Sequence, residues 1–122
     1  MAQMRKAAVA AGEPALAGKA IDRAHLRQMT FSDAALENEV LGLFDRQAAS
    51  MLELIPVAQP DVLPALAHAV KGSARGIGAW HVARAAAALE ADPHGDSAAL
   101  VEALVEARAE IAKILTEILP RN

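Results

Sequence analysis

Apolar side chains recur at helical spacing through most of this chain, and this periodicity limits the fold more than any other feature of the sequence. The clearest case begins at Ser32, a residue type that caps helices, and stops at Pro56, which interrupts them. A helix of that length would be about 36 Å long at 1.5 Å per residue. Its apolar stripe comprises Leu36, Val40, Leu43, Met51 and Leu54. The pattern predicts one long amphipathic helix between the cap and the proline.

Three more helical segments follow, and turn signals separate them. One begins near Pro60 or Asp61 and extends to about Gly76, the next covers residues 79–92, and the last starts after Ser97. The apolar stripe of the last segment comprises Leu100, Leu104, Ala107, Ile111, Leu115 and Ile118. Four amphipathic helices with short connections predict an all-α, antiparallel four-helix bundle.

The bundle is expected to occupy residues 21–122, with a short helix near residues 21–29 before the four longer ones. The preceding residues contain Gly12, Pro14 and Gly18 and show no sustained periodicity. We therefore expect residues 1–20 to form an N-terminal tail that is short or partly disordered.

Composition favours helices that approach one another closely, and it narrows the function classes. Over half of the 122 residues are hydrophobic but only three are aromatic, so Ala, Leu, Val and Ile must build the core. The formal net charge of -3 argues against a protein that binds duplex DNA. The chain has no cysteine, which excludes disulfides and thiolate metal sites and agrees with a reducing compartment.

The apolar segments are too short to enter or cross a membrane. No stretch approaches the roughly 18 consecutive apolar residues of a membrane span. The apolar run near the N-terminus is interrupted at Gly12, which makes it too short for an export signal. We therefore expect a cytoplasmic protein that binds neither membranes nor nucleic acid.

The sequence LAHAVKGSARGIGAW around His68 places three glycines in a segment that otherwise predicts a helix. At 100° per residue, His68 points away from the apolar side of that helix and shares its face with Lys71, Gly72 and Arg75. Gly72 and Gly76 each cost the helix about 1 kcal/mol relative to alanine, the residue that this chain uses elsewhere. A compensating requirement for open space near the imidazole is therefore expected.

The residue types at Gly72 and Lys71 suit a histidine that carries a phosphoryl group. They suit a solvated histidine without a functional role less well. Gly72 leaves the space over the preceding turn empty, so a bulky group can approach the ring of His68. Lys71 offers a flexible ammonium that neutralises an anion placed on the imidazole. A neutral imidazole is a competent nucleophile at neutral pH, and a phosphoryl group on it adds close to two negative charges.

The stretch HAVKGSARGIGA, from His68 to Ala79, resembles the signature of the histidine-containing phosphotransfer (HPt) domain. That signature is His, two residues, Lys-Gly-Ser or Lys-Gly-Ala, a small residue, two variable positions, an aliphatic residue, then Gly-Ala or Gly-Leu. The resemblance covers residues 21–119. It implies a helical bundle in which His68 accepts a phosphoryl group from a receiver-domain aspartyl phosphate and passes it to the aspartate of another receiver.

The resemblance also implies the partners and the roles of neighbouring residues. Lys71 would position and neutralise the phosphate, and Gly72 would keep the ring accessible. The partners would be receiver domains of response regulators and hybrid histidine kinases. The chain would need no cofactor of its own, because the Mg²⁺ that assists transfer would be bound by the receiver. We expect a monomer that docks transiently through this exposed stripe and the apolar residues of the helix containing Phe44.

Three further residues have supporting roles. Ser73 lies toward the core boundary, where it can pack or bond back to the preceding turn. Arg75 is either a solvated charge or part of the docking surface. Gln47 falls within an apolar stripe, and members of the HPt family often place a polar side chain of this helix near the histidine. Gln47 could therefore hold the second ring nitrogen or the phosphate, although an amide in water is an equally good interpretation.

Two glycines close the motif. Gly78 fits the position after a helix end or a close contact between helices. Gly76 departs from the family pattern, which often has a polar residue there, and it has no chemical role in this interpretation.

Other functions are weaker. No Gly-rich phosphate loop follows a strand, so the chain has no ATP site and should act as a phosphotransfer intermediate without kinase activity of its own. The main alternative is a non-catalytic helical adaptor that binds a partner helix, with His68 incidental. A helix-turn-helix DNA binder is disfavoured by the acidic balance and by the alanine-rich helix that follows the glycines.

Overall fold

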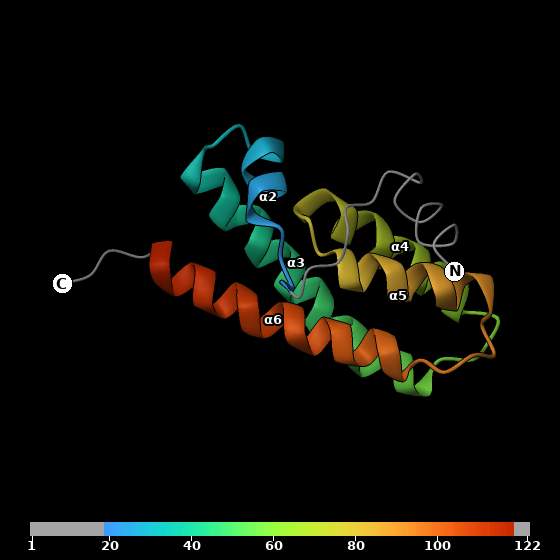
Figure 1. Cartoon of the computed structure of the whole chain (residues 1–122). Helices are drawn as coiled ribbons and strands as arrows, with labels where there is room; N and C mark the ends of the chain where they lie inside the picture. The colour runs from blue at the N-terminus through green and yellow to red at the C-terminus, as the bar shows by residue number, and fades with distance from the viewer. Residues whose placement is uncertain (1–18, 119–122) are drawn as a thin grey trace.

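The computed structural model describes residues 19–118, and within that range the fold consists of helices without strands. The elements are α2 (Arg23–Met29), α3 (Ala34–Leu54), the 3₁₀ turn η1 (Ile55–Val57), α4 (Leu63–Ile77), α5 (Trp80–Ala91) and α6 (Ala98–Ile118). The two long helices α3 and α6 lie side by side, and the pair formed by α4 and α5 packs against them (Figure 1). The expected all-α four-helix bundle is thus confirmed, with α2 as an additional short helix. The predicted tail falls almost entirely on residues 1–18, which lie outside the described residues.

The long helix α3 begins one residue later than the sequence predicts. Its N-cap is Asp33, whose side chain accepts a hydrogen bond from the Leu36 amide at 3.1 Å. The expected cap, Ser32, instead lies in a left-handed turn with a φ of 59°, and its amide donates to the Arg27 carbonyl at 2.8 Å. The prediction of Ser32 as the cap was wrong because the tight turn after α2 uses this residue, so the adjacent carboxylate caps α3.

The core is built mainly from small and aliphatic side chains, as the composition predicts. α4 and α5 form the most extensive interface between helices, and buried alanines of both, such as Ala74 and Ala83, allow the close approach. On α3 the inward face carries Leu41, Phe44, Ala48 and Met51. Leu43 was expected in the apolar stripe but is 54% exposed, because the inward face of α3 is centred on Phe44 instead.

Gly78 ends α4 and sets the direction of α5. It adopts a left-handed conformation with a φ of 82°, and the amides of Gly78 and Ala79 both donate to the Ala74 carbonyl. A Cβ atom at this position would lie 2.8 Å from the backbone oxygen of Asp22. Gly78 is therefore the left-handed helix end that the sequence allows, and its close neighbour is the backbone of Asp22, which caps α2, rather than another helix.

The segment before α2 is tied to this turn by side chains. The Trp80 indole donates to Asp22 Oδ2 at 3.0 Å, and Asp22 also caps α2 by accepting from the His25 amide. The His25 ring contacts the Trp80 ring with centroids 4.8 Å apart, and its Nε2 lies 2.8 Å from the Arg75 carbonyl oxygen. These contacts hold α2 against the C-terminal end of α4.

Candidate functional site

His68 lies in the middle of α4 on the side that faces away from the core. Ala67, Val70 and Ala74 of the same helix are buried, whereas the His68 side chain is 69% exposed. Helical geometry requires this orientation, because His68 lies well away in angle from the residues that α4 turns toward the bundle. The imidazole is therefore accessible to a second protein.

A carboxylate from the neighbouring helix contacts both His68 and Lys71. Glu90 of α5 places Oε2 at 2.8 Å from His68 Nδ1 and Oε1 at 2.5 Å from Lys71 Nζ. The side chains of Lys71 and Glu90 are 18% and 29% exposed, so this part of the site is more sheltered than the ring. The three side chains form one connected group, in which each Glu90 oxygen has a different partner.

The electrostatics of the Glu90, His68 and Lys71 side chains decide which nitrogen of the His68 ring is available to react. The hydrogen bond from Lys71, and next the one from His68, hold the pKa of Glu90 below its ordinary value, so Glu90 is ionised at neutral pH. An ionised carboxylate can only accept hydrogen bonds, which assigns the proton of a neutral His68 to Nδ1. The lone pair then belongs to Nε2, which has no hydrogen-bond partner within residues 19–118.

The glycines that follow His68 leave open space on this surface. A Cβ atom at Gly72 or at Gly76 would meet nothing within 4 Å. Packing inside the domain therefore does not require glycine at either position. The space beside His68 that the sequence predicts at Gly72 is present in the structure.

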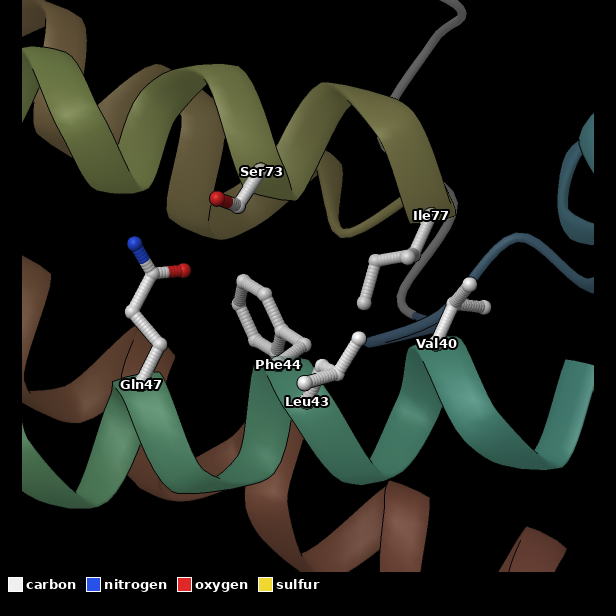
Figure 2. A pocket seen from close by; sticks show the side chains of 6 residues that line it. All are labelled: Val40, Leu43, Phe44, Gln47, Ser73 and Ile77. Carbon is white, nitrogen blue, oxygen red and sulfur yellow. The ribbon is translucent and has the colours of Figure 1, made fainter.

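Gln47 and Ser73 lie on the opposite side of α4 from Glu90, in an open groove between α3 and α4. Figure 2 shows their side chains pointing toward each other across this groove, with Phe44 beside them. Val40, Leu43 and Ile77 complete the lining. The Ser73 hydroxyl lies 3.3 Å from the Ala69 carbonyl, a bond back to the preceding turn. The second ring nitrogen of His68, which was considered for Gln47, is held by Glu90 instead.

Glu90 is the residue that sequence reasoning missed, although a signal for it exists. It is the only acidic residue of α5. His68 and Glu90 each lie eleven positions from Ala79, at the turn between two antiparallel helices. A tight helical hairpin brings residues at equal distances from its turn opposite each other. Arg75 lies two turns beyond His68 on α4, and its carbonyl is the partner of His25.

Comparisons with known proteins agree with this geometry. A family model described as the Hpt domain matches residues 25–118, which include His68, Lys71 and Glu90. The structure is similar to that of the histidine phosphotransferase ShpA from Caulobacter crescentus, with 32% sequence identity and a TM-score of 0.71. That match covers 80% of this chain and 92% of ShpA. A comparison with curated proteins finds no match. Among the described helices, none is both long and apolar enough to cross a membrane.

Proposed function

Because the chain belongs to the Hpt domain family, we propose that it is a cytoplasmic relay protein in which His68 carries the phosphoryl group between two receiver domains. Family membership and the likeness to ShpA support a phosphotransfer role in phosphorelays. The contact of Glu90 with Nδ1 is the observation that carries the assignment to His68, because it leaves Nε2 as the nucleophile on the exposed side of α4.

The proposed transfer is a displacement at phosphorus. The lone pair of Nε2 attacks the aspartyl phosphate of one receiver, and the bond between phosphorus and the carboxylate oxygen breaks. In the second step the aspartate of another receiver attacks the same phosphorus and His68 leaves. Lys71 lies one turn from His68, and its ammonium has three donors, so it can bond a phosphoryl oxygen as well as Glu90. The Mg²⁺ that assists transfer is assigned to the receiver domain.

The docking surface is assigned to the exposed stripe of α4 and the groove beside it. Leu43, which is 54% exposed, offers apolar contact, while Gln47 and Ser73 offer polar contact in the same groove. The groove adjoins the face of α4 that carries His68, so a receiver bound there would bring its aspartate toward Nε2. A small mixed surface of this kind suits transient docking of a monomer.

The direct test is His68→Gln, with His94→Gln as the matched control in the exposed turn after α5. Both proteins are mixed with a receiver domain that carries a labelled aspartyl phosphate. We expect His68→Gln to lose all labelling with an unchanged circular dichroism spectrum, and His94→Gln to be labelled like the native protein. The label should be acid-labile and stable in base. Labelling of His68→Gln would overturn the assignment, and binding of a partner helix without any labelling of the native protein would favour the adaptor.

A further inference from the structure

Glu37 is an ionisable residue on the inward side of α3, where an apolar side chain is expected. Its side chain is buried, with only 7% of the residue exposed, and its Oε2 atom has no hydrogen-bond partner among the described residues. A buried carboxylate normally has a partner of opposite charge, because burial of an isolated one is costly. The other buried residues of α3 are apolar, namely Leu41, Phe44, Ala48 and Met51.

The neighbouring turn and the start of α3 do not supply a donor to Glu37. Thr30, the other buried polar residue of the described chain, directs its hydroxyl to the Leu26 carbonyl at 2.8 Å. In the first turn of α3, the Leu36 amide donates to Asp33 Oδ1 and the Glu37 amide donates to the Asp33 carbonyl. The dipole of a helix favours a negative charge near this end, but it places no hydrogen on Oε2. The donor must therefore come from another segment.

The cations of α2 do not bond Glu37 either. Arg23 Nη1 donates to Glu117 Oε1 of α6 at 2.7 Å. Arg23 Nε is buried, and it has no hydrogen-bond partner in the described part of the chain. Arg27, the other cation of α2, is exposed. Thus α2 contributes an ion pair to the end of α6 but leaves the carboxylate of α3 unpaired.

The end of α6 is level with Glu37 along the bundle. The antiparallel helices α3 and α6 are joined by Asp45 and Arg108, whose Oδ1 and Nε atoms are 2.8 Å apart. Glu37 lies eight residues before Asp45, and Thr116 lies eight residues after Arg108, so these two positions are at the same level. Figure 1 shows the start of α3 and the end of α6 at the same end of the molecule. Along the helix axis, Ile118 is therefore about 3 Å from the level of Glu37.

We propose that Arg121 binds the Glu37 carboxylate, so that residues 119–122 connect the end of α6 to the start of α3. Arg121 is the charged side chain among these four residues, and it follows Ile118 by three positions. Three extended residues span about 10 Å, which exceeds the offset between the two levels. Pro120 disfavours a continuation of the helix, so the chain can turn back toward α3.

The chemistry of a guanidinium suits this carboxylate. Arginine has five donors in a planar arrangement and can bond both oxygens of a carboxylate through two parallel hydrogen bonds. It remains charged when it is partly buried, and it is more weakly hydrated than an ammonium. Glu37 thus becomes a paired charge instead of an isolated one. This contact is separate from the proposed relay, because Glu37 lies on α3 and not on the face of α4 that carries His68.

The test is a double-mutant cycle of Glu37→Gln and Arg121→Gln, with stability measured by urea unfolding at pH 7. In the native background, Arg121→Gln should raise the unfolding equilibrium constant about tenfold, the effect of one charge-assisted hydrogen bond. In the Glu37→Gln background, the same substitution should change that constant by less than about twofold, because its partner is absent. An equal effect of Arg121→Gln in the two backgrounds would overturn the proposal.

The matched control is Lys113→Gln, which changes the net charge by the same amount. Lys113 is an exposed cation of α6 to which the structure gives no ion pair within residues 19–118. Its substitution should change the unfolding constant by less than about twofold in either background. If Lys113→Gln had the same background-dependent effect as Arg121→Gln, the coupling would reflect net charge and the proposal would be wrong.

A second measurement requires no variant. In the native protein, nuclear Overhauser contacts between the Cδ protons of Arg121 and the Cγ protons of Glu37 report the pair directly. Their presence supports the proposal, and their absence overturns it even if Glu37→Gln fails to fold. Contacts of Glu37 with Arg23 instead would show that Arg23 turns from Glu117 to Glu37, which would also overturn the proposal.

Discussion

Two histidines of this protein are held by oxygen atoms of another element, and the two environments differ. His25 bonds the backbone carbonyl of Arg75 through Nε2 and lies against the buried ring of Trp80. His68 bonds the side chain of Glu90 through Nδ1 and leaves the rest of its ring largely exposed. The first arrangement joins α2 to the end of α4, and Nε2 of His25 has a structural role there. The second orients the ring and keeps Nε2 available for a partner.

The largest expected difference between the two regions appears when each histidine is replaced by alanine. His68→Ala should lose all labelling by a phosphorylated receiver and keep its stability, because the ring has no core contacts. His25→Ala should be labelled normally but lose about 1–2 kcal/mol of unfolding free energy, since one hydrogen bond and one aromatic contact disappear. Urea unfolding and receiver labelling of both variants measure the contrast. Equal losses of stability would contradict it.

The next effect is expected at Gly78, which belongs to the structural region. Gly78→Ala should destabilise the protein by about 2 kcal/mol or more, because the new methyl group meets the Asp22 backbone and the left-handed conformation disfavours a Cβ atom. Thermal unfolding followed by circular dichroism measures the loss. A variant as stable as the native protein would show that the turn can shift away from Asp22.

Gly72 belongs to the proposed functional region, and there a substitution by alanine is expected to stabilise the protein instead of destabilising it. Gly72→Ala should stabilise α4 by up to about 1 kcal/mol, because the added methyl group meets no other atom and alanine favours helices. Labelling of His68 should nevertheless become slower, since the methyl group narrows the approach to the ring. Gly76→Ala is the control, because it has the same open space one turn farther from His68. If both variants are labelled at the native rate, Gly72 has no role in access.

The smallest expected effect is a change of stability at acidic pH. The indole of Trp80, followed by the His25 amide, lowers the pKa of Asp22 from its ordinary 3.8. The ionised Asp22 carboxylate therefore stabilises the fold above pH 3.8, the ordinary pKa of the group. This contribution is lost as the pH falls through the lowered pKa of Asp22 in the folded protein. Trp80→Phe should cost about 1 kcal/mol at pH 7 and less at pH 3. Urea unfolding at the two pH values tests this, and an equal cost at both would exclude a contribution from the Asp22 charge.

Several features of the fold could be predicted because they depend on neighbours along the chain. The spacing of apolar residues predicts the four long helices, and the same geometry turns His68 away from the core. The predicted cap of α3, Ser32, was wrong, because Asp33 is an equally good capping residue type and only the turn after α2 selects it. The exposure of Leu43 was also not predicted, because the spacing of apolar residues along α3 does not show which face of the helix another helix will cover.

The sequence by itself determined the four long helices and the shared face of His68, Lys71 and Gly72, because a helix places side chains by local geometry alone. Only the tertiary structure decided which partner holds the imidazole. Glu90 reaches His68 because closely packed alanines bring α4 and α5 together and because the turn at Gly78 sets their register. That pairing joins residues 22 positions apart on two different helices, so no periodicity within one helix contains it.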